Sequence, residues 1–379
     1  MVARPWGFKS PPEHHLFLMD LPIIQLCSAL LYTAAALCLF LMLLNRVMII
    51  WPDSKAKGMI IPAVFLITTG SAATTGFILP WSPWIYGPAL VLLLIAAGEV
   101  RLVFLRRAYA GSGPINSKPH AVNLTSPVTT TDCVTHRYEM EHMAWQGERL
   151  RVVQITDIHA HPDFPLEYYQ RIFDIAGQAN PDLVVFTGDF ITSLDSLDML
   201  SQILRPVGKA VNIAVLGNHD YWAGADPVRQ VIKKSGLKLL TEESINLSIR
   251  GQNVLVTGHD YPWGLRNRTI PPRGDAVLHV ILSHTPDNIF RLAAAAADIV
   301  FSGHCHAGQI RIPFLGPIVV PSIYGRLFDH GHFIINGSHL FVASGIGASL
   351  PPVRIYCQPD IFIVDVVAKG GGSASLRNG

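Results

Sequence analysis

The chain has 379 residues, enough for more than one structural unit, because domains commonly contain about 100 to 200 residues. It is 50% hydrophobic and only 15% charged, with a mean hydropathy of +0.34, which argues against an ordinary soluble enzyme and for a part embedded in a membrane. A net charge of +2 without a basic, aromatic-rich run gives no sign of a nucleic-acid partner, and five cysteines without C-x-x-C spacing exclude a disulfide framework and a zinc ribbon.

Three apolar segments predict transmembrane helices within residues 1–107, at about 23–44, 59–79 and 84–105. Each is close to the length of roughly 20 residues that a helix needs to cross about 30 Å of hydrocarbon. For the first segment the alternative is a cleaved signal peptide, but its apolar core is too long and two further segments follow. We therefore expect a multi-pass membrane region at the N-terminus.

Positive charge predicts the orientation of this region, because short loops rich in Lys and Arg stay in the cytoplasm. The loop after the first segment contains Arg46, Lys55 and Lys57, and Arg106 and Arg107 follow the third segment. The turn between the second and third segments has no basic residue. The pattern places residues after 106 in the cytoplasm and anchors the chain in the inner (cytoplasmic) membrane, although two early basic residues, at positions 4 and 9, oppose it.

The composition changes after the third segment. Residues 108–132 are rich in Gly, Ser, Pro, Asn and Thr, which is typical of a linker or a loosely attached loop. We expect a second domain over residues 133–368 and a flexible tail over 369–379.

Within this second domain, short apolar runs alternate with amphipathic helical segments. We expect strands at 151–156, 182–187, 211–216, 254–257, 277–282, 298–302, 339–343 and 361–367. We expect helices at 166–179, 196–204, 227–235 and 286–297. Such alternation predicts a layered α/β fold, and because the later strands lack a helix between each pair, a mixed pair of sheets is favoured over a purely parallel one.

Five of the expected strands are followed at once by side chains that bind metal ions. In chain order these side chains are Asp157, His159, Asp189, Asn218, His284, His304 and His306. Taken singly, such residues have ordinary explanations, since an aspartate can cap a helix and an asparagine can occupy a left-handed turn. Strand ends in layered α/β folds meet at one rim, however, so five occurrences together predict one metal site.

The number of donors predicts two metal ions. Seven donors exceed what one ion of four to six ligands needs once water is included, and a bridging carboxylate would reconcile the count. Two cations roughly 3.5 to 4 Å apart can clamp a phosphoryl oxygen and lower the pKa of a shared water, which then supplies a hydroxide for attack on phosphorus. Oxygen and nitrogen donors without thiolate favour Mn²⁺, with Fe or Zn²⁺ as alternatives.

The ordered motifs D-x-H, GD, GNHD, H and GHxH resemble those of the calcineurin-like metallophosphoesterase superfamily over about residues 150–310. The forms GNHDYW and GHCHAGQIRIP further resemble its bacterial membrane-associated branch, which includes phosphodiesterases and UDP-2,3-diacylglucosamine pyrophosphatases of lipid A synthesis. The resemblance implies the α/β fold of that superfamily, a layered sandwich of two mixed β-sheets flanked by helices, preceded here by a transmembrane helical region.

The resemblance also implies roles for single residues. It assigns Asp157, His159 and His306 to the first metal, assigns Asn218, His284 and His304 to the second, and makes Asp189 the bridge. It makes His219 the catalytic imidazole and Asp220 the residue that orients it. That His219 only fills the turn after Asn218 remains the alternative.

A membrane anchor favours a substrate confined to the same surface. We expect hydrolysis of a lipid-linked phosphodiester or pyrophosphate, for which the resemblance implies UDP-2,3-diacylglucosamine. Arg266 and Arg268 could bind a substrate phosphate or could lie in a solvated loop, and the apolar segment 312–328 could contact acyl chains, touch the bilayer or pack as a lid. A broad phosphodiesterase or phosphatase and a non-catalytic membrane sensor are the alternative functions.

Overall fold

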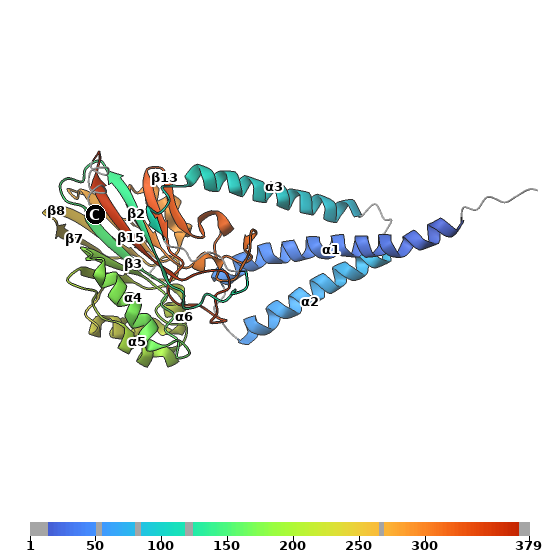
Figure 1. Ribbon diagram of the computed structural model, residues 1–379, viewed down its shortest axis with the longest axis horizontal. Coiled ribbons are helices and arrows are strands. Elements are labelled where there is room, and N and C mark those ends of the chain that lie inside the picture. Colours follow the sequence, from blue (N-terminus) through green and yellow to red (C-terminus); the bar gives the residue numbers. More distant parts are fainter. Residues whose placement is uncertain (1–13, 51–54, 80–84, 118–123, 265–268, 371–379) are drawn as a thin grey trace, which may run out of the picture. The chain divides into compact units, whose positions relative to one another are not determined.

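The computed structural model describes residues 14–50, 55–79, 85–117, 124–264 and 269–370. The chain divides into two compact units, the first comprising Met1–Leu44 and Asp53–Arg101, the second Asn45–Pro52 and Leu102–Gly379. Figure 1 shows helices in the first unit and two sheets with surrounding helices in the second.

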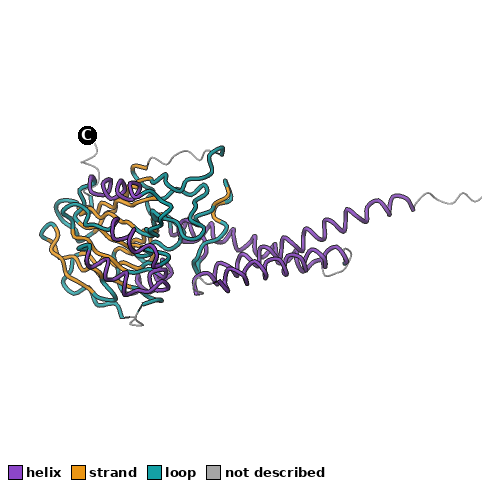
Figure 2. Tube along the Cα trace, turned by 90° about the horizontal axis from the view of Figure 1, so that it is seen from below, coloured by secondary structure: helices purple, strands orange, loops and turns teal. Residues whose placement is uncertain are grey.

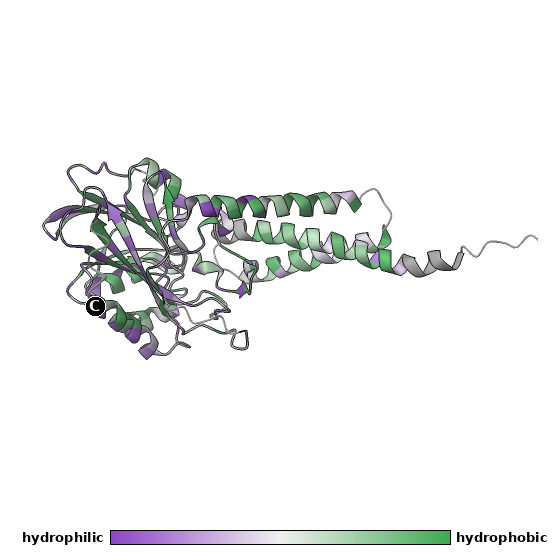
Figure 3. Ribbon diagram, turned by 45° about the horizontal axis from the view of Figure 1, so that its top comes forward, coloured by the Kyte–Doolittle hydropathy of each residue, from purple (hydrophilic) through white to green (hydrophobic). Residues whose placement is uncertain are grey.

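The first unit is built from three apolar helices, α1 (His14–Ile50), α2 (Lys55–Ile78) and α3 (Tyr86–Tyr109), of which α3 continues into the second unit. The stretches Pro22–Leu44, Ala56–Ile78 and Tyr86–Tyr109 are long and apolar enough to cross a membrane. Figure 3 shows hydrophobic residues along most of each helix. The expected segments are thus present as helices, with α2 beginning earlier and α3 ending later than the sequence suggested.

Helices α1 and α2 approach each other closely. A Cβ added to Gly76 would lie 2.7 Å from the Cα atom of Ala29. The rings of Phe40 and Phe65 pack edge to face with centroids 5.4 Å apart. Small residues allow apolar helices to come together in this way where there is no water to drive association.

The second unit contains two mixed sheets. The seven-stranded sheet has the order β1 (Asn116–Ser117), β2 (Val134–His142), β15 (Asp360–Ala368), β3 (Leu150–Ile155), β4 (Leu183–Thr187), β5 (Val211–Val215) and β6 (Lys238–Leu239). The six-stranded sheet has the order β13 (Gly331–Ile335), β14 (Ser338–Val342), β10 (Ile299–Ser302), β9 (Leu278–Ser283), β8 (Gln252–His259) and β7 (Ser244–Ile249). A short hairpin pairs β11 (Arg311–Ile312) with β12 (Gly316–Pro317).

Parallel strands form the centre of both sheets. Strands β3 to β6 are parallel, and so are β8, β9, β10 and β14. Strand β15 is antiparallel to β3 and parallel to β2, whereas the edge strands β7 and β13 pair antiparallel to their neighbours. The predicted pair of mixed sheets flanked by helices is therefore confirmed.

Helices cover the outer faces of the sheets. They are α4 (Leu166–Gln178), α5 (Leu197–Ile203), α6 (Asn218–Lys234) and α7 (Ile289–Ala294), with 3-10 turns at Leu194–Ser196, Pro286–Asn288, His306–Gly308 and Gly325–Phe328. Figure 2 shows the strands in the interior of this unit with helices and loops around them. Helix α6 begins at Asn218, nine residues before the expected position, and a kink at Gly224 separates this first turn region from the part that the sequence predicted.

Alternation along the strands creates the layers of the core. Val152 and Val185 join the apolar layer between the two sheets, while their neighbours Val153 and Val184 face α4, α5 and α6. A third layer lies between the six-stranded sheet and α7, and Leu105 at the end of α3 packs against it.

Residues 108–132, which the sequence suggested as a linker, pair with the second unit where they are described. Strand β1 pairs with β2, and Val128 forms a bridge to Ile355. The amide of Thr129 donates to the carbonyl oxygen of Arg354 at 2.9 Å. This segment therefore contributes backbone hydrogen bonds to the sandwich.

Candidate metal centre

The seven predicted donor side chains follow the ends of five parallel strands, β3, β4, β5, β9 and β10. The carboxyl ends of parallel strands meet at one edge of a layered fold, which explains why residues so distant in sequence gather here. All seven are at most 5% exposed, which brings two carboxylates and four imidazoles into one apolar-walled region.

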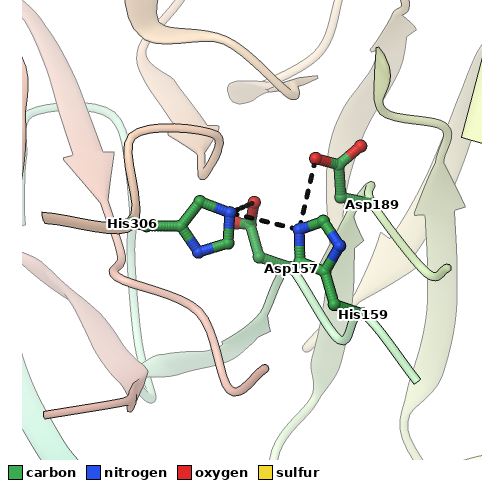
Figure 4. A group of neighbouring side chains, drawn as sticks. All are labelled: Asp157, His159, Asp189 and His306. Carbon is green, nitrogen blue, oxygen red and sulfur yellow. Dashed lines mark hydrogen bonds and ion pairs between the residues drawn. The ribbon is translucent and has the colours of Figure 1, made fainter. Parts of the chain in front are cut away.

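The first group consists of Asp157, His159, Asp189 and His306, whose donor atoms lie within 4.8 Å of one another. The Nε2 atom of His306 is 3.3 Å from Oδ1 of Asp157, and the Nε2 atom of His159 is 3.5 Å from Oδ2 of Asp189. Figure 4 shows the two imidazoles turning their edges toward each other and toward the carboxylates. Their Nε2 atoms are only 3.1 Å apart.

The second group consists of Asp189, His284 and His304. The Nε2 atom of His284 lies 3.2 Å from Oδ2 of Asp189 and 3.0 Å from Oδ1 of Asn218, so the amide oxygen joins the same group. Asp189 is the one residue that the two groups share. The arrangement therefore offers two neighbouring positions for cations on either side of one carboxylate.

A buried atom in these groups points to a cation as its missing partner. Nε2 of His304 is buried and has no hydrogen-bond partner, while Oδ2 of Asp189 faces the imidazole nitrogens of His284 and His159 at 3.2 and 3.5 Å. A buried polar group without a partner loses its hydration without compensation, so such groups are rare. Carboxylate oxygens and imidazole nitrogens are ligands for divalent transition ions, so the residues present fit a metal.

The pKa values of the two aspartates also point to bound cations. Burial raises the pKa of Asp157 to about 7, even though the charge of His284 acts to lower it. For Asp189 burial also acts to raise the pKa, but the charges of His284 and His219 hold it well below the ordinary value. A buried carboxylate needs nearby positive charge to remain ionised, which a bound cation would provide.

The backbone at the donors is strained. Asp157, His159, Asp189, His304 and His306 all have positive φ angles, between 38° and 67°. Such conformations are uncommon for residues other than glycine and cluster at functional sites. Gly303 allows the close packing, since a Cβ there would lie 2.0 Å from Oδ2 of Asp157.

Further side chains fix the orientation of the donors. Thr192 Oγ1 lies 2.8 Å from Nδ1 of His159, and the carbonyl oxygen of Thr187 lies 2.6 Å from Nδ1 of His284. Partners of this kind set the orientation of metal-binding imidazoles.

Arg354 is a residue of the site that the sequence did not reveal. Its side chain is fully buried, donates to the carbonyl oxygens of Ser344 and Gly347, and places Nη2 3.2 Å from Nδ1 of His306. It lies in the irregular segment before β15, where no motif or periodicity marks it. Only the tertiary fold brings it behind His306.

His219 lies at the edge of the two groups. Its amide donates to Oδ1 of Asp189 at 2.9 Å, and its half-buried ring packs edge-on against the rings of His159 and Trp222 at 4.9 and 5.0 Å. The position leaves an imidazole beside the shared carboxylate and open to solvent on one side.

Asp220 acts on the backbone. Oδ1 accepts hydrogen bonds from the amides of Phe190 and Ile191, and Oδ2 accepts one from Gly217. These bonds tie the loop after β4 to the start of α6, from which His219 projects. In the structure Asp220 therefore holds the backbone of the two loops beside His219.

The proposed phosphate-binding arginines, Arg266 and Arg268, lie outside the described residues. Close to that segment, Trp263 packs against His284 and His304 with ring centroids 5.8 and 5.1 Å away. Together with Trp222 it gives the site an aromatic border. Aromatic faces of this kind can stack with a substrate base or cover its apolar part.

The family model for calcineurin-like phosphoesterases matches residues 150–308, the stretch that supplies all the predicted donors. At least three relatives match along more than half of this chain. An uncharacterized metallophosphoesterase, YkuE of Bacillus subtilis (strain 168), is 26% identical over 263 residues, covering 65% of this chain and 86% of its own.

The other two relatives have names that state an activity. Phosphodiesterase YaeI of Escherichia coli (strain K12) is 24% identical over 224 residues, covering 57% of this chain and 82% of its own. UDP-2,3-diacylglucosamine pyrophosphatase LpxG of Chlamydia muridarum (strain MoPn / Nigg) is 26% identical over 276 residues, covering 57% of this chain and 83% of its own. The similarity extends well beyond the short motifs.

Proposed function

Since this chain carries a calcineurin-like metallophosphoesterase domain over residues 150–308 and is a phosphoester hydrolase by family, we propose that it cleaves a lipid-linked phosphodiester or pyrophosphate at a membrane surface. The observation that carries this proposal is the pair of donor groups that share Asp189. UDP-2,3-diacylglucosamine is the substrate we propose first, because one relative bears the name of that activity.

We assign the donors to two divalent ions, Mn²⁺ first and Fe or Zn²⁺ as alternatives. Asp157, His159 and His306 would hold one ion, Asn218, His284 and His304 would hold the other, and Asp189 would contribute to both. Two ions bound there would supply charge for the phosphoryl oxygens and would lower the pKa of a water, which favours hydrolysis at phosphorus.

The residues of the chain have the remaining tasks. His219, beside the shared carboxylate and open to solvent, donates a proton to the leaving oxygen. Asp220 positions His219 by holding the backbone of the loops on both sides of it. Trp222 and Trp263 border the site and exclude water from the apolar part of the substrate.

Two features support a lipid-linked substrate. The first is the set of three helices that are long and apolar enough to cross a membrane. The second is the β11–β12 hairpin just after the last metal motif, where Phe314 is fully exposed and Leu315 is 62% exposed. Arg326 donates to the carbonyl oxygen of Leu315, and Arg311 lies on β11 of the same hairpin, a combination of basic and apolar residues that suits a bilayer surface with anionic lipids.

We further propose the inner (cytoplasmic) membrane as the location, with the sandwich in the cytoplasm. The basic residues that follow the first and third apolar segments of the sequence support this orientation. A reporter fused after Gly379 that is active only in the cytoplasm is the expected result. Activity only outside it would contradict both the orientation and a cytosolic nucleotide substrate.

The full-length protein in detergent micelles tests the function. With Mn²⁺, we expect release of UMP from UDP-2,3-diacylglucosamine and slower cleavage of bis-p-nitrophenyl phosphate. His219→Ala should lower kcat for both by about 100-fold or more, as loss of a general acid commonly does, while leaving the bound metal unchanged.

The outcomes separate the candidate functions. If the protein cleaved simple diesters but left the nucleotide lipid intact, UDP-2,3-diacylglucosamine would not be its substrate. The protein would then be a broader phosphodiesterase, and phosphodiesterase is the activity that the name of YaeI states. An absence of turnover with any ester, with metal bound, would make the protein a non-catalytic sensor and contradict hydrolysis.

A further inference from the structure

A second cluster of metal-binding side chains lies outside the centre described above. It consists of His136 on β2, His330 just before β13 and Asp360 at the start of β15, with one donor atom from each within 4.8 Å of the others. The Asp360 side chain is 1% exposed, that of His136 12% and that of His330 29%. Residues from three elements thus meet around one buried carboxylate.

The geometry directs three donor atoms toward one point. Nε2 of His330 is 2.6 Å and Nε2 of His136 is 3.7 Å from the same oxygen, Oδ2 of Asp360. The two rings meet edge to face with centroids 5.7 Å apart. Ligands about 2 Å from a tetrahedral ion are roughly 3.3 Å from one another, so a small opening of the His330–Asp360 pair would admit the ion.

The opposite sides of two of these groups are held by other residues. Oγ of Ser117 lies 2.8 Å from Nδ1 of His136, and the amide of Ser344 donates to Oδ1 of Asp360 at 2.8 Å. Contacts of this kind orient imidazole and carboxylate ligands toward a metal. They leave Nε2 of His136 and Oδ2 of Asp360 as the atoms available for it.

The cluster forms part of the wall of a cavity of about 170 Å³, which is also lined by Arg106, Arg311 and Asp329. Arg106 makes an ion pair with Asp329, and Nη1 of Arg311 is 3.6 Å from Oδ2 of the same residue. Asp329 therefore already has two guanidinium groups as partners, whereas the partners of Asp360 are the two imidazoles of His136 and His330.

The protonation states suit a metal. Burial acts to raise the pKa of Asp360, but the charge of His330 and the hydrogen bond to it keep this pKa below the ordinary value. Burial lowers the pKa of His136. Near neutral pH the carboxylate is therefore ionised and the His136 imidazole neutral, the forms in which both groups bind metal ions.

We propose that His136, His330 and Asp360 bind a third divalent ion, of the Zn²⁺ or Fe²⁺ class, with its remaining coordination position open to the cavity. Two imidazoles and one carboxylate are a ligand set that zinc and non-haem iron sites use. The site joins β2, β15 and the loop before β13, and thereby links the two sheets.

The proposed site adjoins the first centre and is separate from it. Ala307, which directly follows the donor His306, lines the cavity, and so does Cys357, whose Sγ donates to the carbonyl oxygen of His306 at 3.2 Å. An ion held here would restrain the segment that carries His306. The proposal does not depend on which ester the first centre cleaves.

The test measures the zinc content per chain of the protein in detergent. The protein is first stripped with a chelator, then reloaded with Zn²⁺, and excess zinc is removed by gel filtration. We expect His136→Gln and His330→Gln each to bind one zinc ion fewer than the wild type. They should retain the wild-type circular dichroism and the Mn²⁺-dependent cleavage of bis-p-nitrophenyl phosphate. His332→Gln is the matched control. His332 lies on β13, the strand that follows His330, but its imidazole bonds to Ser112 and His339 instead.

Equal zinc content in the wild type and both variants would overturn the proposal and make the cluster an ion pair only. If the single variants fold poorly, a double variant that disrupts the first centre provides a second test of the proposed site. In Asp189→Asn with His304→Gln, which disrupts the first centre, we expect one zinc ion to remain and to be lost when His330→Gln is added. A background that retains no zinc would likewise contradict the site.

Discussion

The donor residues of the first centre occupy backbone conformations that few side chains adopt, and the glycines between them make this packing possible. Five donors have positive φ angles, and Gly303 leaves no room for a Cβ beside Asp157. Strain of this kind persists only where the surrounding structure determines it fully. The fold thus holds the donors in place before any ion binds.

Gly303→Ala tests this tight fit. The added Cβ would lie 2.0 Å from Oδ2 of Asp157 and 2.2 Å from Oγ1 of Thr156, so the carboxylate has to move. We expect about 1 to 3 kcal/mol of destabilisation, as in other overpacked sites, together with weaker Mn²⁺ binding. Urea unfolding and metal titration measure the two effects. Gly113→Ala, where a Cβ meets nothing within 4 Å, should change neither.

The sequence predicted which side chains gather at this edge of the sheets, because each lies within four residues of the end of a strand and a local pattern therefore marks it. Arg354 and the bonds of Asp220 have no such mark. Arg354 reaches His306 across a separation of 48 residues, and Asp220 accepts from amides about 30 residues away. Contacts to distant backbone atoms depend on how loops fold together, which no spacing of residue types encodes.

Strand β15 contains a buried acid that serves both of its neighbours. Oδ2 of Asp365 accepts from Arg137 on β2 at 2.6 Å, and Oδ1 accepts from Arg151 on β3 at 2.7 Å. Burial acts to raise the pKa of Asp365, but its hydrogen bonds to Arg151 and Arg137 keep the pKa below the ordinary value. The strand is thereby joined to the two strands beside it through charge as well as through backbone bonds.

A lowered folded-state pKa gives a stability that depends on pH. The contribution of Asp365 is fully present above the unfolded-state pKa of about 3.9 and is lost as the pH falls through the lower folded-state pKa. We expect Asp365→Asn to lower the free energy of unfolding by about 3 kcal/mol at neutral pH. The difference from the wild type should shrink below about pH 4.

Urea unfolding over a pH series checks this prediction. Asp174→Asn is the control, because Asp174 makes an exposed ion pair with Arg205 and should change stability by less than about 1 kcal/mol. An Asp365→Asn difference that stays constant from neutral pH to strongly acidic pH would contradict the role of the ion cluster.

The β11–β12 hairpin is the element we expect to meet acyl chains or the bilayer. Phe314→Asp places a charge where a fully exposed apolar ring stands. We expect a higher KM for UDP-2,3-diacylglucosamine in lipid nanodiscs, by roughly 10-fold, from the loss of apolar contact. The KM for bis-p-nitrophenyl phosphate should stay the same. Met143→Asp, also at an exposed apolar position, is the control, and equal effects of both variants would refute the assignment.

Among the elements, the sequence revealed the apolar central strands more clearly than the edge strands. It did not predict β2, β7 or β13. Strand β2 (VTHRYEMEH) carries charged and polar side chains, one of which, Arg137, meets its partner Asp365 only in the sheet. Strand β7 lies at the edge of its sheet with several exposed side chains, so its apolar signal is weak. These strands form because they pair with strands from other parts of the chain.

At the level of the whole molecule, the boundary between the two units falls inside helix α3. Residues from Leu102 onward belong to the second unit, and Leu102, Leu105 and Tyr109 pack against the layer outside the six-stranded sheet. Composition alone placed this boundary at the end of the apolar segment, because hydropathy does not tell lipid-facing leucines from packed ones.

Two shortened chains, one starting at residue 102 and the other at residue 112, test this boundary. We expect the longer chain to be more stable by roughly 2 to 4 kcal/mol, since it keeps these apolar contacts. Thermal unfolding followed by near-ultraviolet circular dichroism measures the difference. In the longer chain, Leu105→Ser should lower the midpoint, while Phe104→Ser, at a residue 64% exposed, should not. Equal midpoints for the two chains would contradict the packing.

The place of β15 has a consequence for biosynthesis. This strand is the last described one in the chain, and it lies between β2 and β3, which are made more than 200 residues earlier. The ribosome must therefore release the chain as far as β15 before the seven-stranded sheet can close, long after the apolar helices have been translated. Until then β2 and β3 expose unpaired edges, and a nascent chain in that state is a natural client for chaperones.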